Sequence, residues 1–261
     1  MIRLPFIRVR PVHTAIRHPL LTWLTVLALS ACGQQGTEMT DTPRRNELFG
    51  SPKAAALFSA ASKGDLERAR QLMAEGVSLN SANAKEQTLL KVAMLTGDRK
   101  AFTHLLDLGA DPTYLGQADQ TPMHLAAVLE NSYWLKSLLD RKASTEVLDA
   151  MGETPLFDAL GPQTAENVQL LLAAGANIHV KNRSNETLLH KAANIHSFSD
   201  VARFVELGVD PTAKDDLGFT FQYSFFATPE RALHSDAQAA RAKVRAWLRA
   251  HSIPVEEAGP R

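Results

Sequence analysis

The sequence contains only one cysteine, Cys32, among its 261 residues. A single cysteine excludes a disulfide within the chain, and it excludes zinc sites built from several thiolates. The chain also has no excess of charge of either sign, because 28 basic residues balance 28 acidic ones. Binding to nucleic acid depends on a basic surface that neutralises phosphates, so we expect no nucleic-acid partner.

Catalytic sequence motifs are absent as well. The chain has no nucleophile elbow, no His-Glu-x-x-His pair and no glycine-rich phosphate loop. Its nine histidines do not follow metal-ligand spacings. We therefore expect no catalytic site, no metal and no cofactor, and catalysis is the least favoured of the possible functions.

The apolar stretch near the start of the sequence is short. Leu20–Ala31 has twelve residues, whereas a helix that spans a bilayer needs about 20. Four arginines and no acidic residue precede the stretch, and the small residues Ser30 and Ala31 close it. This order of basic, apolar and small residues is typical of a secretory signal peptide.

The segment Leu29-Ser30-Ala31-Cys32 resembles the lipobox of bacterial lipoproteins. The resemblance implies that residues 1–31 are a signal peptide and that Cys32 is lipidated and begins the mature protein. It also implies the periplasm, and Gly33 favours the outer membrane because an aspartate there commonly retains lipoproteins in the inner membrane. The alternatives are a simple signal anchor and a chance cysteine behind a signal peptide.

The segment that follows the cysteine has the composition of a linker. Residues 33–52 lack hydrophobic periodicity and contain three glycines, two prolines and mostly polar side chains. With Cys32, they predict a flexible tether over residues 32–52.

The rest of the chain repeats itself with a period of 33 residues. One series of equivalent positions is Thr88, Thr121, Thr154, Thr187 and Thr220. A second series with the same period is Gly76, Gly109, Lys142, Gly175 and Gly208. Two independent series that share one period indicate a repeat architecture.

The repeat resembles the ankyrin repeat. Residues 121–127 read TPMHLAA and residues 171–177 read LLAAGAN, which match the start and the end of that repeat. The rival is a tetratricopeptide array with a period of 34, which lacks the turn-rich segment found here before each threonine. In the ankyrin family the histidine of this motif, His124 or His190 here, makes structural hydrogen bonds.

The resemblance implies an all-α ankyrin-repeat solenoid of helix pairs joined by β-hairpin loops, over residues 53–254 and followed by a tail at 255–261. We expect about six units including caps, at 53–87, 88–120, 121–153, 154–186, 187–219 and 220–254. Lys142 stands where glycine is expected, so strain or a shifted cap is predicted there. An insertion near Phe225–Asp236 should precede a final helix from about Ala237 to His251.

Such a solenoid presents an extended concave surface, which in ankyrin proteins usually binds another protein. We expect a monomer that binds a protein partner on this face. The predicted partner-binding residues at hairpin tips and inner helices are Leu95, Gln117, Val128, Leu129, Met151, Glu153, Arg183, Glu186, Asn194 and Ile195, with Lys85 as a further tip residue. These side chains can instead serve only to pack the stack.

Three functional hypotheses remain open from the sequence. The first is a lipid-tethered periplasmic adaptor or inhibitor, in one form an immunity protein against a secreted antibacterial hydrolase. The second is a periplasmic scaffold linked to stress, of the kind that supports catalase activity. The third is an enzyme, against which the missing motifs argue.

Overall fold

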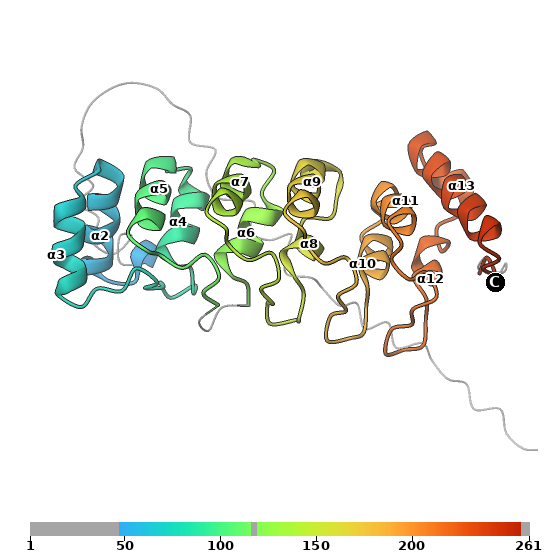
Figure 1. Ribbon diagram of the computed structural model, residues 1–261, viewed down its shortest axis with the longest axis horizontal. Coiled ribbons are helices and arrows are strands. Elements are labelled where there is room, and N and C mark those ends of the chain that lie inside the picture. Colours follow the sequence, from blue (N-terminus) through green and yellow to red (C-terminus); the bar gives the residue numbers. More distant parts are fainter. Residues whose placement is uncertain (1–46, 116–118, 257–261) are drawn as a thin grey trace, which may run out of the picture. The chain divides into compact units, whose positions relative to one another are not determined.

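The computed structural model describes residues 47–115 and 119–256. The predicted signal peptide, Cys32, most of the predicted tether and Gln117 therefore lie outside the described residues. The described chain forms six successive pairs of helices in a row (Figure 1). The pairs are α2 (Pro52–Lys63) with α3 (Leu66–Ala74), α4 (Leu89–Thr96) with α5 (Arg99–Asp107), α6 (Pro122–Val128) with α7 (Tyr133–Asp140), α8 (Pro155–Asp158) with α9 (Ala165–Ala173), α10 (Leu188–Asn194) with α11 (Phe198–Glu206), and α12 (Gln222–Phe225) with α13 (Ser235–Ala250).

Several of the repeat threonines cap inner helices, whereas Thr154 makes no cap bond and its buried Oγ1 has no hydrogen-bond partner. The hydroxyls of Thr88 and Thr121 accept hydrogen bonds from the backbone N–H groups three residues later. Thr187 does the same within a capping box completed by the His190 side chain. Such bonds satisfy the free N–H groups in the first turn of a helix, and Pro122 and Pro155 at the first helical position need none.

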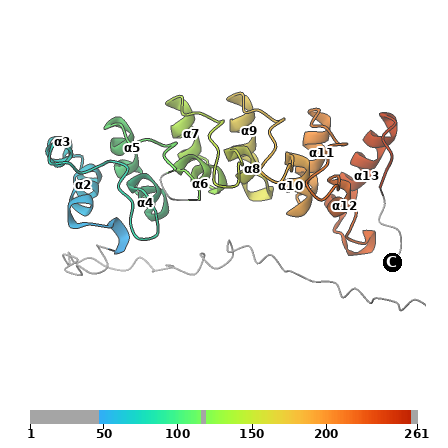
Figure 2. The ribbon, with the colours of Figure 1, turned by 90° about the horizontal axis from the view of Figure 1, so that it is seen from below.

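The helices form two layers with the hydrophobic core between them. Figure 2 shows α2, α4, α6, α8 and α10 in one row, the inner helices, and α3, α5, α7, α9 and α11 in the other, the outer helices. Phe102, Leu135 and Phe157 are fully buried in the core, and so are the small residues Ala126 and Ala192. The alanines let inner helices of successive repeats approach closely, which keeps the core continuous along the row.

The loops between repeats turn back at one edge of the stack (Figure 1). Within the described residues they hold one isolated antiparallel bridge, between Ala82 and Thr88, and otherwise turns. None of the described helices has both the length and the apolar character that crossing a bilayer requires.

The predicted boundaries need two corrections. Glu47–Phe49 form a helical turn, and Phe49 is buried with its ring 4.9 Å from that of Phe58, so these residues belong to the folded unit and not to the tether. At the other end, Glu256 N donates to Gln222 Oε1, so the tail does not begin at residue 255.

The predicted departures from the repeat are present in the structure. Lys142 has a φ of 63°, the left-handed conformation that glycine adopts at equivalent positions. The last unit contains a 3-10 turn, η3 (Glu230–Ala232), before α13. The final helix spans Ser235–Ala250, close to its predicted bounds, and packs against α11.

Candidate protein-binding surface

Four of the predicted partner-binding side chains form a series of exposed apolar groups. Leu95, Val128, Met151 and Ile195 are 52%, 41%, 54% and 46% exposed. Leu95 lies on α4, Val128 ends α6, Ile195 follows α10 and Met151 lies in the hairpin loop between α7 and α8. We call these four residues the apolar strip, and their exposure agrees with the sequence-based expectation.

Two predicted contacts are not free surface residues. Leu129 is half-buried and packs against the core, and its carbonyl oxygen accepts a hydrogen bond of 2.7 Å from Asn167 Nδ2. Glu153 is only 5% exposed, and its carboxylate pairs with Lys191 Nζ at 2.7 Å. The prediction that Glu153 lies exposed at a hairpin tip is therefore wrong, because a lysine 38 residues later covers it.

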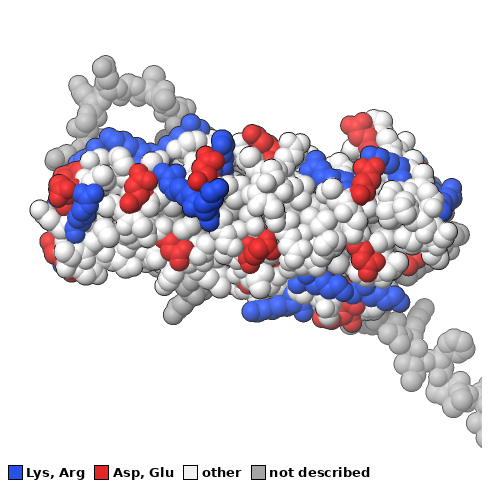
Figure 3. Space-filling view, viewed as in Figure 1, with Lys and Arg blue, Asp and Glu red and all other residues white. Residues whose placement is uncertain are grey.

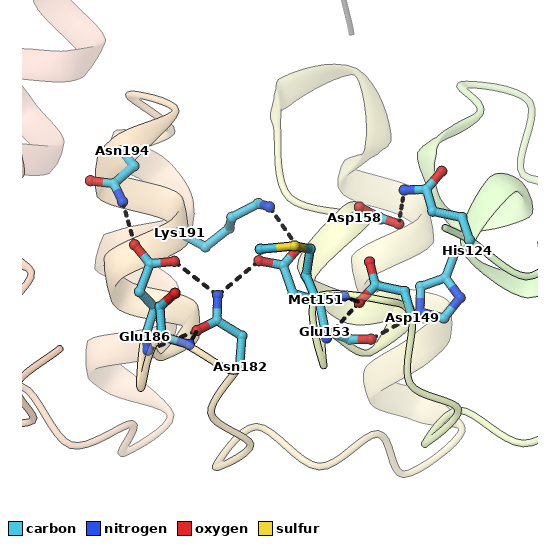
Figure 4. Close-up of polar contacts among 11 residues, drawn as sticks. His124, Asp149, Met151, Glu153, Asp158, Asn182, Glu186, Lys191 and Asn194 are labelled. Atoms are coloured by element: carbon cyan, nitrogen blue, oxygen red, sulfur yellow. Dashed lines mark hydrogen bonds and ion pairs between the residues drawn. The ribbon is translucent and has the colours of Figure 1, made fainter. Parts of the chain in front are cut away.

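Glu153 instead belongs to a polar network that joins residues of three successive repeat units (Figure 4). Asn182 Nδ2 donates to Glu153 at 3.0 Å and to Glu186 at 2.8 Å. Asn194 Nδ2 donates to the other oxygen of Glu186 at 2.9 Å. Glu186 and Asn194 were predicted to bind a partner, and the structure joins both to this network while Asn194 stays exposed.

A half-buried carboxyl group, that of Asp158, lies near the network. Asp158 Oδ2 accepts a hydrogen bond of 2.9 Å from Gln120 Nε2. Burial raises the pKa of Asp158 to about 7, with Glu153 and Asp149 adding to the rise while Lys191 opposes it. Asp158 and Lys191 occupy the position that holds Leu125 in its own repeat, so an ordinarily apolar site has become charged. Asp158 therefore gains or loses a proton near neutral pH.

The two motif histidines are structural. His124 is fully buried, with Nδ1 2.7 Å from Thr121 Oγ1 and Nε2 3.0 Å from the carbonyl oxygen of Glu153. Burial lowers the pKa of His124, which favours the neutral ring. His190 makes the equivalent contacts with Thr187 and Phe219. In the described part of the chain, no three His, Cys, Asp or Glu side chains are grouped as metal ligands.

Each of the last three hairpin loops is braced by an acidic or amide side chain. Asp149 Oδ1 accepts from the N–H groups of Met151 and Glu153, and Asp215 Oδ1 accepts from those of Leu217 and Phe219. Asn182 forms the same pair of bonds in the loop between them. The loops therefore hold their exposed side chains on a fixed backbone.

Neighbouring hairpins are also joined by backbone hydrogen bonds. Ala150 N donates to Asp119 O at 2.9 Å, Arg183 N donates to Met151 O at 2.9 Å, and Asp216 N donates to Ser184 O at 3.1 Å. The hairpin tips thus form one connected edge along the stack.

Sequence reasoning missed an exposed apolar group at the end of this edge. Leu217 is 79% exposed, and the rings of Phe219 and Tyr223 stack with their centroids 4.2 Å apart. Leu217 precedes Thr220 by three residues, as Met151 precedes Thr154. That shared spacing was the signal that would have found Leu217.

Comparison with known proteins supports the repeat and the fold. No protein-family model matches the chain. Protein PhlB of Serratia liquefaciens is 35% identical over 142 residues, 54% of this chain and 62% of PhlB. A transient receptor potential cation channel subfamily A member 1 homolog of Caenorhabditis elegans is 33% identical over 163 residues, 61% of this chain and 13% of that protein. The chain thus spans less than two thirds of either relative.

A solved structure shows the fold directly. The ankyrin repeat domain of Bcl-3, a member of the IkappaB family, is 27% identical, with a TM-score of 0.58 over 74% of this chain and 85% of that domain. The chain therefore has an ankyrin-repeat fold, whose usual role is to bind other proteins.

Proposed function

We propose that this protein is a non-enzymatic, monomeric binding protein that holds a protein partner on the side of the stack formed by the inner helices and hairpin tips. The observation that carries the proposal is the apolar strip. Leu95 and Val128 each follow their repeat threonine by seven residues, and Ile195 follows Thr187 by eight. Exposed apolar side chains gathered on one side of a rigid scaffold are typical of a surface that a protein partner covers.

The polar network supports the same surface. Its ion pair and amide bonds lie next to the strip in sequence, since Met151 precedes Glu153 by two residues and Ile195 follows Asn194. A network whose charges are already paired holds the backbone of three successive units in place before a partner arrives. Preorganisation of this kind reduces the entropic cost of binding.

The proposal includes a lipid anchor at Cys32 in the periplasm, with the outer membrane favoured. The lone cysteine, the apolar stretch before it and the polar segment after it support this assignment. Several acyl chains hold a protein firmly, because each buried CH₂ contributes about 0.8 kcal/mol.

Mass spectrometry of the mature N-terminus should find an acylated Cys32, and Cys32→Ser should release the protein from the membrane fraction. An unmodified cysteine on protein in the soluble fraction would contradict the anchor.

We propose, as the specific form of this function, inhibition of a secreted antibacterial hydrolase. A binding protein tethered at a membrane is placed where such an enzyme acts. The test is a pull-down from solubilised envelope with wild-type and Cys32→Ser protein in parallel. One stoichiometric hydrolase that loses activity when bound supports the proposal. A partner whose activity is unchanged rejects the inhibitor form, and the absence of any partner rejects the binding function itself.

A further inference from the structure

The last three hairpin loops, which backbone hydrogen bonds connect, carry a distinctive combination of side chains. Met151, Arg183 and Leu217 are all exposed, one in each of three successive loops. The backbone bonds from Arg183 to Met151 and from Asp216 to Ser184 hold these loops side by side. Lys181 and Lys214 are exposed in the same loops. We call these five residues the tip ridge.

The cations of the tip ridge are unneutralised by ion pairs. Among the described residues, neither Lys181, Arg183 nor Lys214 forms a salt bridge, although Lys181 is near enough to Asp210 to contribute to lowering the pKa of Asp210. Figure 3 shows basic side chains gathered along the lower edge of the stack, with an acidic side chain among them, in the region of these hairpins.

The acidic side chains of the same loops accept hydrogen bonds from the hairpins themselves. Asp149 and Asp215 accept hydrogen bonds from the backbone of their own hairpins. Asp216 Oδ1 accepts a bond of 2.6 Å from Asn185 Nδ2 in the preceding hairpin. In these loops, the cations of the tip ridge therefore form fewer hydrogen bonds and ion pairs than the carboxylates do.

The stem of Arg183 lies against the backbone of the preceding hairpin. A Cβ atom at Gly152 would lie 3.1 Å from Arg183 Cγ, so the aliphatic part of the arginine passes close over that glycine. The guanidinium group extends from a positioned stem and can form two parallel hydrogen bonds to a carboxylate. Arginine and methionine are both enriched in protein interfaces.

We infer that the tip ridge is the docking surface for an acidic protein segment that also carries apolar side chains. Carboxylates of the segment pair with Arg183, Lys181 and Lys214, and its apolar side chains cover Met151 and Leu217. This inference rests on the proposed function, since it names the chemistry of the partner that this side of the stack holds.

The test uses defined peptides with the full chain in detergent. Fluorescence anisotropy is measured with labelled 12-residue peptides of alternating Glu and Leu, alternating Lys and Leu, and alternating Glu and Ser, with micelle background measured without protein. The Glu–Leu peptide should bind most tightly, and its affinity should fall with added salt. Equal binding of all three peptides, or no binding, would overturn the inference.

Matched variants locate the binding. Arg183→Glu with Lys214→Glu should weaken Glu–Leu binding about tenfold or more. Leu217→Ser should weaken it about fivefold. The exposed residues Arg249 and Leu207 lie away from the hairpins, on α13 and at the end of α11, so Arg249→Glu and Leu207→Ser should leave binding within about twofold. Circular dichroism checks that every variant keeps its helices, and equal effects of ridge and control variants would reject the tip ridge.

Two further measurements distinguish a failure of the tip-ridge inference from a failure of the proposed function. Vesicles of phosphatidylglycerol and of phosphatidylcholine are offered to the same variants, and ridge-dependent binding to phosphatidylglycerol without peptide binding would assign the surface to lipid and overturn the inference. A pull-down with the ridge variants then tests the wider function. An envelope partner that the ridge variants still retain leaves the proposed function standing and rejects only the tip ridge.

Discussion

At some positions of this repeat the backbone conformation restricts which residue fits, and at others the surroundings of the side chain do. Lys142 is an example of the first kind. At equivalent positions Gly76, Gly109, Gly175 and Gly208 have φ between 86° and 98°, and Lys142 takes the same left-handed region with a φ of 63°. A residue with a Cβ pays a steric cost there of about 1–2 kcal/mol. Because Lys142 is exposed, little packing depends on its side chain.

Lys142→Gly should therefore stabilise the protein. We expect the free energy of unfolding in urea to rise by about 0.5–1 kcal/mol, since relief of strain exceeds the added entropy of the unfolded chain. The control is Gly175→Lys, where no atom lies near the new Cβ and only the backbone conformation is tested. That variant should lose about 1 kcal/mol. Destabilisation by Lys142→Gly would contradict the account of this position.

Asp158 is an example of the second kind, because its surroundings change the pKa of its carboxyl group. This change should make the stability of the protein depend on pH. Its pKa is about 7 in the folded state against 3.8 in the unfolded state, so the folded state binds more protons between these values. Its contribution to stability is therefore lost as pH rises from about 4 through about 7. The thermal midpoint of the wild type relative to Asp158→Asn should fall across this range.

Lys191→Met provides the control for Asp158. Removing the lysine removes a charge that opposes the rise, so the pKa of Asp158 should increase further. Carboxyl chemical shifts followed by NMR measure both pKa values. A midpoint for Asp158 near 4 in the wild type would show that the carboxyl is hydrated.

The sequence predicted single residues well where the repeat pattern alone decided them. Lys142 takes the left-handed conformation of the glycines at equivalent positions. The burial of Glu153 does not follow from that pattern, because Asn182 and Lys191 cover it from the next two units. Leu129 was misjudged because its side chain packs against the core.

Among the elements, α13 shows how the last repeat closes the stack. Arg241 of this helix is 2% exposed, and its guanidinium donates to the carbonyl oxygens of Phe225 and Thr228 at 2.6 Å each. The Arg241 guanidinium also lies 5.4 Å from the Phe198 ring centroid on α11. One side chain therefore joins α11, α12 and α13. Burial of the charge lowers the pKa of Arg241, while Glu230 counteracts this.

Arg241→Met should loosen the final unit. Two buried carbonyl oxygens lose their donor, and we expect a loss of about 3 kcal/mol with faster amide hydrogen exchange in α13. Arg249→Met, an exposed substitution on the same helix, should change stability by less than about 0.5 kcal/mol. Similar effects of the two substitutions would show that Arg241 does not hold this end.

The sequence predicted which helices are present better than it predicted how long each helix is. The final helix and the insertion before it followed from the shift in the repeat. The inner helices α8 and α12 are short, at Pro155–Asp158 and Gln222–Phe225, although the period alone suggested full repeats. Gly161 has a φ of 135° and precedes Pro162, and this pair interrupts the fourth repeat. The predicted end of the tether, residue 52, was too late in the chain. The packing of Phe49 on Phe58 cannot be recognised from the neighbouring residues alone.

For the whole molecule, the side of the stack that we propose for binding differs from the side that the outer helices form. The outer helices complete the core, whereas the inner helices and hairpins present the apolar strip and the tip ridge. The period of 33 residues was enough to predict this architecture. The identity of the partner is not encoded locally, since it depends on how exposed side chains from several repeats combine.

The most direct test of the central claim is photo-crosslinking in the cells that produce the protein. A photoreactive amino acid is placed at Val128, at Ile195 or, as the control, at the exposed Leu207 at the end of the outer helix α11. The account predicts one protein adduct of the same identity from Val128 and Ile195 and none from Leu207. Adducts from Leu207 alone, or from none of the three positions, would contradict it.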